Sequence, residues 1–294
     1  MTETSRYDAL VDRVGVLYTN DQLREAIELL ETESTGLEVW AAELAHLKAC
    51  VLGAAGNANA ALQTLQDASD AGAWWRPSIL TDDDDLAALR GQRQFEQLVE
   101  VSRDRVTDDP TPPLVALSAE APTEVVVALH GAGQRAGHAQ QDWSGVLKLG
   151  KALVCVESSQ RMSPMYRTWP DRDSAAADIA RALGQLPAEL SGVPMIAAGF
   201  SAGGRAALDW ALTAQPQPAA GVVVMAPALR ELPRSAAGRL SPATVLIGTD
   251  DDLLDEVDEA ADQLIAFGCT IQRLPGLGHT FPADFAERLA AILA

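Results

Sequence analysis

A serine flanked by glycines is the first residue whose surroundings predict chemistry. Residues 199–204 read GFSAGG, so Ser201 stands in a G-x-S-x-G pattern after the apolar run VPMIAA and before RAALDWALTA. Where a strand turns sharply into a helix and holds a side chain clear of the sheet, the residues two before and two after must be very small. A serine hydroxyl is a weak nucleophile at neutral pH and needs a base. The pattern therefore predicts a nucleophile if the chain also supplies a base and an acid.

Four histidines are candidates for the base. His279 lies in LPGLGHTFPADF, between the last predicted strand and the last predicted helix, and we expect it to face Ser201. His130 ends the predicted strand VVVALH. His138 follows in the same loop, as a surface residue or a substrate contact, and His46 lies in the helical N-terminal part with a structural or solvated role.

The base needs an acid that fixes the tautomer and orientation of its imidazole ring. The predicted strand ATVLI is followed by glycine, threonine and three aspartates at 248–252. Between the serine and the last histidine along the chain, these aspartates give the order serine, aspartate, histidine. That order is the one described for catalytic triads of one large class of hydrolases.

The elements that must position these groups begin after residue 113, where apolar runs of strand length alternate with helical stretches. The predicted strands are 114–118, 124–129, 151–156, 194–199, 220–225, 243–247 and 269–273. Most are continuous apolar runs, typical of strands covered on both faces. Strict alternation predicts an α/β domain with a mainly parallel sheet and helices on both faces. Ligands of such sheets bind beyond the carboxyl ends of the strands, where the serine, the aspartates and the last histidine fall.

The N-terminal part has a helical rhythm instead. Apolar residues recur near helical spacing over 7–18, 21–31, 37–52 and 59–68. The segment AELAHLKACVLGAAGNANAALQTLQDA resembles a tetratricopeptide helix hairpin with Gly56 at its turn, although Lys48 stands where that pattern has a small residue. A plain helical bundle is the alternative. We expect a helical, tetratricopeptide-like domain over 1–104, a proline-rich linker over 105–113 and an α/β domain over 114–294.

The α/β domain resembles the α/β-hydrolase superfamily of serine hydrolases. The resemblance covers about residues 112 to 294 and rests on VVVALHGAG, GFSAGG, VLIGTDDD and LPGLGHTF, in this order at four predicted strand ends. The stretches HGAGQ, CVESSQ and WPD are similar to the esterase, thioesterase and dienelactone-hydrolase-like branch. The resemblance implies an α/β-hydrolase fold and cleavage of a carboxylic ester or thioester through an acyl-enzyme, with no metal ion or organic cofactor.

The resemblance also implies roles for particular residues. These are Ser201 as nucleophile, His279 as general base and acid, Asp251 as triad acid, and the backbone amides of Ala132 and Ala202 as the oxyanion hole. In the family's G-x-x-D pattern the acid lies three residues after the glycine, which selects Asp251. Asp250 is the alternative, because a run of aspartates blurs the register.

The loop SSQRMSPMYRTWPD follows the predicted strand 151–156 and should border the site. The candidates for an apolar acyl pocket are Met162, Met165, Tyr166 and Trp169. Packing at the domain edge is an equal alternative for these four side chains. The same region carries Arg161, Arg167 and Arg172, which either receive a substrate carboxylate or pair with the acidic surface.

Charge and composition limit the other classes of function. The net charge is −19, and such a surface repels nucleic acid and anionic lipid. No apolar run reaches the length of a transmembrane helix and the N-terminus has no signal core, so we expect a cytoplasmic protein with a small-molecule acyl substrate. The three cysteines should be free thiols, without zinc spacing to any histidine. The acidic run 82–85 predicts either an exposed helix start or a metal site.

Two other readings of the function remain open. In one, the helical part binds a protein partner and the α/β domain is a scaffold or regulatory domain. In the other, the fold and triad are kept but the reaction is acyl transfer, lactone opening or amide cleavage. The complete set of serine, aspartate and histidine favours an enzyme over an inactive domain.

Overall fold

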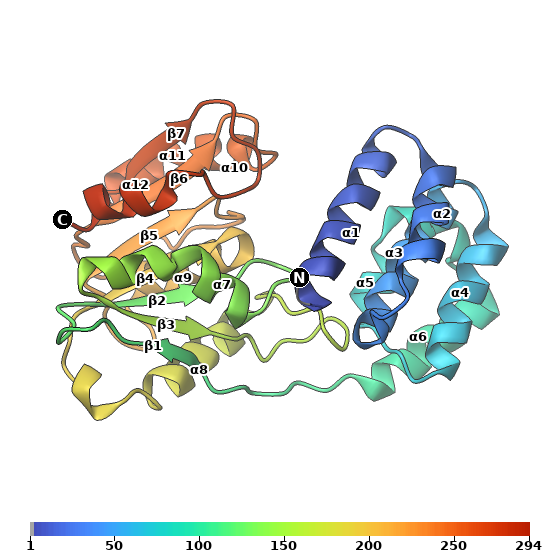
Figure 1. The fold of residues 1–294 in the computed structure, drawn as a ribbon, viewed down its shortest axis with the longest axis horizontal. Helices are drawn as coiled ribbons and strands as arrows, with labels where there is room; N and C mark the ends of the chain where they lie inside the picture. Colours follow the sequence, from blue (N-terminus) through green and yellow to red (C-terminus); the bar gives the residue numbers. More distant parts are fainter. Residues whose placement is uncertain (1–2) are drawn as a thin grey trace. The chain divides into compact units, whose positions relative to one another are not determined.

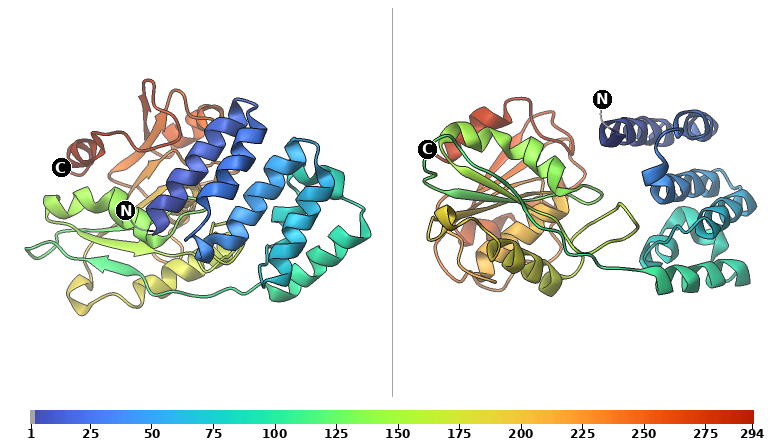
Figure 2. Two further views of the ribbon diagram at one scale, coloured as in Figure 1. Left: turned by 45° about the vertical axis from the view of Figure 1, so that its right-hand side comes forward. Right: turned by 60° about the horizontal axis from the view of Figure 1, so that its bottom comes forward.

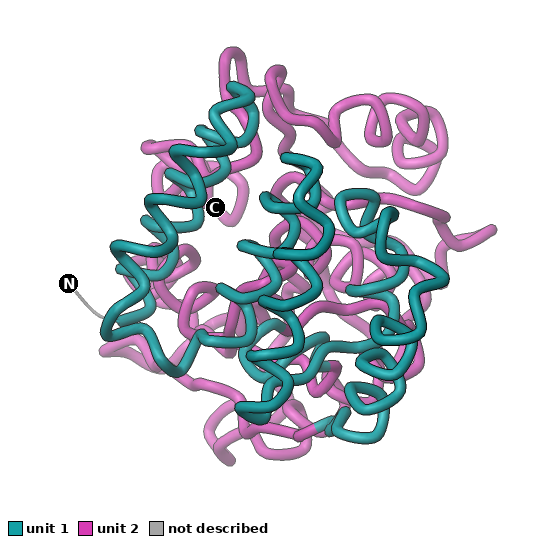
Figure 3. Tube along the Cα trace, turned by 90° about the vertical axis from the view of Figure 1, so that its right-hand side faces the viewer, with its two compact units in different colours: residues 1–108, 161–166 teal, residues 109–160, 167–294 magenta. Residues whose placement is uncertain are grey.

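The computed structural model describes residues 3–294, which form two compact units. Unit 1 runs to Asp108 and also includes Arg161–Tyr166; unit 2 comprises Asp109–Gln160 and Arg167–Ala294 (Figure 3). The hexapeptide Arg161–Tyr166 is therefore grouped with the helices, which the sequence analysis did not anticipate. None of the helices within the described residues is both long and apolar enough to cross a bilayer.

Unit 1 is built from short helices, which confirms the predicted helical N-terminal region (Figure 1). They are α1 (Glu3–Thr19), α2 (Leu23–Glu33), η1 (Glu38–Trp40), α3 (Ala41–Ala54), α4 (Ala58–Asp70), α5 (Pro77–Thr81), η2 (Asp84–Leu89) and α6 (Arg93–Arg105). Helices α3 and α4 form a hairpin whose turn holds Gly56 at φ +76°. The small residues Ala49 and Ala61 are fully buried in the core that this hairpin shares. The likeness to a tetratricopeptide hairpin stays a prediction.

Unit 2 contains one seven-stranded sheet. Its strands are β1 (Leu114–Ala116), β2 (Val125–Leu129), β3 (Ala152–Val156), β4 (Met195–Phe200), β5 (Gly221–Met225), β6 (Ala243–Gly248) and β7 (Thr270–Leu274). The spatial order is β1-β3-β2-β4-β5-β6-β7, and every neighbouring pair is parallel except β1 with β3. All seven predicted strands are confirmed, with ends that differ by at most two residues.

Helices cover both faces of this sheet, as predicted. They are α7 (Ala136–Trp143), η3 (Ser144–Leu149), α8 (Arg172–Leu183), η4 (Ala188–Leu190), α9 (Ser201–Thr213), α10 (Leu254–Glu259), α11 (Ala261–Ala266) and α12 (Phe285–Ile292). Helices α7 and α12 lie on one face, and α8 and α9 lie on the other (Figure 2). Strands β2, β3 and β5 are buried at every residue, because apolar side chains on both faces pack under these helices.

Candidate active site

The predicted nucleophile lies on a sharp turn between β4 and α9. Strand β4 ends at Phe200, and Ser201 opens the helix with φ +52°, a conformation that few residues other than glycine adopt. A Cβ atom at Gly199 would lie 2.4 Å from the carbonyl oxygen of Gly203, and one at Gly203 would lie 2.3 Å from the carbonyl oxygen of His130. Only glycine fits at both positions, so these two residues allow the turn that lifts the serine out of the sheet.

The predicted base and acid lie beside each other. His279 Nδ1 is 3.0 Å from both carboxylate oxygens of Asp251. The Asp251 side chain is fully buried and also accepts a hydrogen bond from the Leu253 amide, so its orientation is defined. Since an ionised carboxylate only accepts hydrogen bonds, Nδ1–H donates to it and Nε2 keeps a free lone pair. The imidazole ring lies 4.8 Å from the ring of Phe200, the residue before Ser201.

Close backbone contacts hold the loop that carries His279 against the end of β6. The Asp250 amide donates to the carbonyl oxygen of Leu277, and the Gly276 amide donates to the hydroxyl of Thr249. A Cβ atom at Gly248 would lie 1.9 Å from that same carbonyl of Leu277. Glycine at the end of β6 therefore lets the two loops approach closely enough for an aspartate of one to meet the histidine of the other.

The neighbouring aspartates are placed differently. Asp250 and Asp252 are exposed, and the Asp250 carboxylate accepts a hydrogen bond from the hydroxyl of Thr249. Asp251 alone in this run is buried and bonded to the histidine. The position of each aspartate in the turn therefore determines its role. The carboxylate of Asp250 is exposed to solvent, and that of Asp251, one residue later, can orient a base.

The two amides predicted to form an oxyanion hole are both available as donors. Ala202 lies in the first turn of α9, where backbone amides have no acceptor within the helix. The Ala132 amide has no acceptor among the described residues, and the loop that carries it is held by a hydrogen bond from the Gly133 amide to the carbonyl of Arg167. Free amides at a helix start attract developing negative charge.

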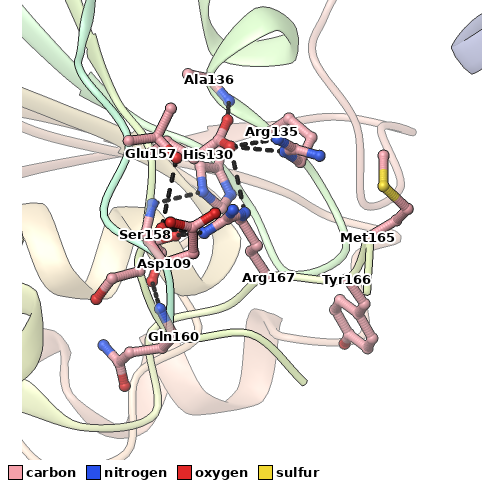
Figure 4. A network of polar contacts seen from close by, with 12 residues as sticks. Asp109, His130, Arg135, Ala136, Glu157, Ser158, Gln160, Met165, Tyr166 and Arg167 are labelled. Carbon is pink, nitrogen blue, oxygen red and sulfur yellow. Dashed lines mark hydrogen bonds and ion pairs between the residues drawn. The ribbon is translucent and has the colours of Figure 1, made fainter. Parts of the chain in front are cut away.

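His130 lies at the start of the loop that carries Ala132. It is fully buried, and burial lowers the pKa of its imidazole to about 4. Its Nδ1 lies 2.8 Å from the carbonyl oxygen of Gly131, and its Nε2 accepts the Ser158 amide at 3.2 Å (Figure 4). A neutral ring with the proton on Nδ1 satisfies both contacts. His130 therefore acts as a structural residue and not as the base.

An ion-pair network beside His130 was missed by the sequence analysis. Glu157 Oε1 accepts a hydrogen bond from Arg135 Nε at 2.8 Å and lies 3.2 Å from Arg167 Nε, while Oε2 accepts the Ala136 amide (Figure 4). Burial alone would raise the pKa of the Glu157 carboxyl, but these donors lower it below its ordinary value. A glutamate directly after the apolar run of β3 is the signal that could have predicted this network.

The four pocket candidates are divided between the two units. Met162, Met165 and Tyr166 belong to the hexapeptide of unit 1, where burial raises the pKa of the tyrosine. Trp169 is fully buried in the core of unit 2, where its indole N–H donates to the carbonyl oxygen of His130. This burial agrees with the packing alternative for Trp169, because the large apolar side chain completes the core next to the loop that follows His130.

A buried carboxylate holds the hexapeptide within unit 1. Glu43 Oε1, from α3, accepts hydrogen bonds from the hydroxyl of Ser163 at 2.6 Å and the amide of Met165 at 2.7 Å. The amide of Arg76 donates to the carbonyl oxygen of Met162. These hydrogen bonds tie the hexapeptide to α3 and to the residue that precedes α5 within the same unit.

The remaining charged candidates have structural partners. His138 Nδ1 accepts the Arg135 amide at the start of α7. The guanidinium of Arg172 lies 3.1 Å from the carboxylate of Asp209, which agrees with the second of the two roles expected for it. His46 is in α3 of unit 1, where its Nε2 lies 3.1 Å from the carbonyl oxygen of Ile79.

Comparisons with known proteins agree with this fold. Residues 6–109 match the family model described as A/B hydrolase-like, N-terminal domain, and residues 120–248 match the one described as Serine aminopeptidase, S33. No curated protein matches the chain. An uncharacterized protein from Bacillus cereus ATCC 10987 is 23% identical, with 98% of this chain and 97% of that chain covered and a TM-score of 0.52.

The esterase PE8 is 19% identical, with 62% of this chain and 97% of its own covered and a TM-score of 0.50. At these identities the likeness to solved structures concerns the fold alone. The first model describes an N-terminal domain and the second describes a hydrolase domain, and each matches less than half of the sequence. The sequence therefore combines an A/B hydrolase-like N-terminal domain, which is helical, with a hydrolase domain of the S33 type that has an α/β-hydrolase fold.

Proposed function

We propose that this protein is a serine hydrolase that cleaves a carboxylic ester or thioester through an acyl-enzyme on Ser201. The observation that carries the proposal is the hydrogen-bonded pair of the buried Asp251 and the exposed His279, 3.0 Å apart. The imidazole ring of this pair lies 4.8 Å from the ring of Phe200, the residue before a serine held at φ +52°. A buried carboxylate that orients an imidazole is the arrangement that activates a serine hydroxyl. The match to the model described as Serine aminopeptidase, S33, supports a serine nucleophile and leaves amide cleavage as the alternative reaction.

In the first step His279 Nε2 accepts the proton of the Ser201 hydroxyl as its oxygen attacks the acyl carbonyl carbon. The bond from this carbon to the leaving group then breaks, and the imidazolium gives its proton to the leaving oxygen or sulfur. In the second step His279 takes a proton from water, the hydroxide attacks the acyl-enzyme, and the serine is released with its proton. Asp251 stabilises the imidazolium in both steps.

The oxyanion of each tetrahedral intermediate would be bound by the amides of Ala132 and Ala202. Each such donor is worth about 10²- to 10³-fold in kcat in enzymes of this type. Their availability supports the assignment, because one amide is in the first turn of α9 and the other has no acceptor within residues 3–294.

A labelling experiment tests the nucleophile. A fluorophosphonate should label the full-length protein on Ser201, and hydrolysis of p-nitrophenyl esters should be lost in Ser201→Ala. Ser235→Ala is the matched control, since Ser235 is an exposed serine outside the helices and strands. Undiminished hydrolysis by Ser201→Ala, or label on another residue, would contradict the proposal.

Hydrolysis assays with oxygen esters and thioesters of increasing acyl chain length then identify the substrate class. A preference that depends on chain length identifies an acyl pocket. Turnover of amides or lactones in place of esters would assign one of the alternative reactions on the same triad. No turnover of any acyl compound, together with no fluorophosphonate label, would leave the α/β domain as a scaffold.

A further inference from the structure

Three side chains in unit 1 place metal-ligand atoms together. His46 and Cys50 are one helical turn apart on α3, and Asp83 precedes η2, 33 residues further along the chain. Their nitrogen, sulfur and oxygen atoms all lie within 4.8 Å of one another. We propose that this His46–Cys50–Asp83 cluster is a zinc site that joins α3 to the turn before η2.

The distances within the cluster match the edges of a zinc coordination tetrahedron. Cys50 Sγ is 3.6 Å from His46 Nε2 and 3.3 Å from Asp83 Oδ2, and Nε2 is 3.7 Å from Oδ2. Zinc bonds of about 2.3 Å to sulfur and about 2.0 Å to nitrogen and oxygen, at tetrahedral angles, give edges of about 3.6, 3.5 and 3.3 Å. The three atoms therefore need shifts of only a few tenths of an ångström to bind one ion.

The backbone holds these ligands before any ion binds. A Cβ atom at Gly53, on the same helix as the two ligands, would lie 2.0 Å from the carbonyl oxygen of Asp85, so α3 and η2 are in direct backbone contact. Asp83 Oδ1 accepts the Asp85 amide at 3.0 Å, which fixes the carboxylate and directs Oδ2 at the thiol of Cys50. The ordering cost of forming the site is therefore small, because the ligands need little rearrangement.

Zinc suits this set of donors. A thiolate, an imidazole and a carboxylate are all ligands of tetrahedral zinc, and the softness of sulfur excludes magnesium and calcium. Binding releases the proton of Cys50 to solvent and moves the proton of His46 from Nε2 to Nδ1. The hydrogen bond from Nε2 to the carbonyl oxygen of Ile79, 3.1 Å away, is then lost, and either this oxygen or a water molecule can take the fourth position on the zinc.

An ion can reach the cluster from solvent. The side chain of His46 is 21% exposed and that of Asp83 is 28% exposed, while Cys50 is buried behind them. The sulfur therefore lies on the protein side of the site, and the other two ligands lie at its entrance. No zinc-ligand spacing can be recognised in the sequence, because the third ligand is an aspartate that lies far from the other two ligands along the chain.

Cobalt titration of the full-length protein, stripped with a chelator, tests the site. We expect one Co²⁺ per chain, with the ultraviolet charge-transfer band of a cobalt–thiolate bond and the visible bands of tetrahedral cobalt. Zn²⁺ should abolish these bands by displacement. The matched pair of variants is Cys50→Ser, which should remove the charge-transfer band, and Cys269→Ser, which should keep it because no candidate metal cluster within residues 3–294 includes Cys269.

If Cys50→Ser does not fold, as judged by circular dichroism, Asp83→Asn and His46→Gln serve instead. The asparagine keeps an oxygen for the Asp85 amide but is a weak ligand, so we expect Co²⁺ affinity to fall by more than about tenfold. Absence of a charge-transfer band in the unchanged protein overturns the proposal. The proposal also fails if the affinity of both of these variants is unchanged, or if the band persists in a folded Cys50→Ser.

Discussion

Replacing Gly203 with alanine tests whether the close approach of α9 to β2 positions the nucleophile. The added Cβ atom would lie 2.3 Å from the carbonyl oxygen of His130 and 2.4 Å from that of Leu129, whereas ordinary contact begins at 3.4 Å. Both neighbours are backbone atoms of β2 or its end, so α9 must move away by about 1 Å. Overpacking of this kind costs about 1–3 kcal/mol, and each kcal/mol lowers Tm by about 2–4 °C in a domain of this size.

The same movement displaces Ser201, two residues earlier on the same helix. A misplacement of about 1 Å at a reacting group costs about 10²-fold in rate. We therefore expect Gly203→Ala to lower kcat for p-nitrophenyl ester hydrolysis by about 10²-fold at a temperature well below its Tm. Steady-state kinetics and a thermal melt measure both effects on the same sample.

Gly137→Ala is the control, because Gly137 is also helical but a Cβ atom there has no atom within 4 Å. This variant should keep its activity and gain about 0.4–1 kcal/mol, since alanine reduces the freedom of the unfolded chain. If Gly203→Ala keeps both the Tm and the kcat of the unchanged protein, the close contact does not position the serine and the reasoning is refuted.

Further predictions concern the acid and the buried histidine. Asp251→Asn should lower kcat by about 10⁴-fold by disturbing the tautomer of His279, whereas the exposed Asp250→Asn should have little effect; the reverse order in ester hydrolysis would reassign the acid. The pKa of His130 is about 4 in the folded protein against an ordinary 6.5, so its contribution to stability is complete above pH 6.5 and is lost as the pH falls toward 4. When the pH is lowered from 7.5 to 5, the free energy of unfolding measured in urea should fall by about 2 kcal/mol more in the unchanged protein than in His130→Gln. Equal losses in the two proteins would contradict this assignment.

Most of the sheet could be predicted from the sequence because its central strands are covered on both faces, whereas the edge strands β1 and β7 are partly exposed. Most of the strands read as continuous apolar runs between polar turns, and the seven predicted segments lie where the strands are. Ser201 and His279 could also be singled out, because the steric demands of a strand-to-helix turn and the position after the last strand leave few alternatives. The roles of these two residues remain predictions until activity is measured.

Residues whose role depends on distant partners could not be predicted in the same way. Asp250 and Asp251 are adjacent, and only the fold of the turn shows which of them is buried. Trp169 lies in a loop, where pocket and core are equally compatible with an aromatic residue. The partners of Ser163 and Cys50 lie 120 and 33 residues away, and no local pattern connects them.

The division of the chain also bears on how its parts can be exchanged between proteins. The chain passes from one unit to the other three times, after Asp108, after Gln160 and after Tyr166. A single recombination point in the proline-rich linker would transfer the helices without the hexapeptide, and the buried carboxylate of Glu43 would lose both of its donors. Successful exchange of the helical unit must carry two separate stretches of sequence, and substitutions at Glu43 should be inherited together with substitutions in 161–166.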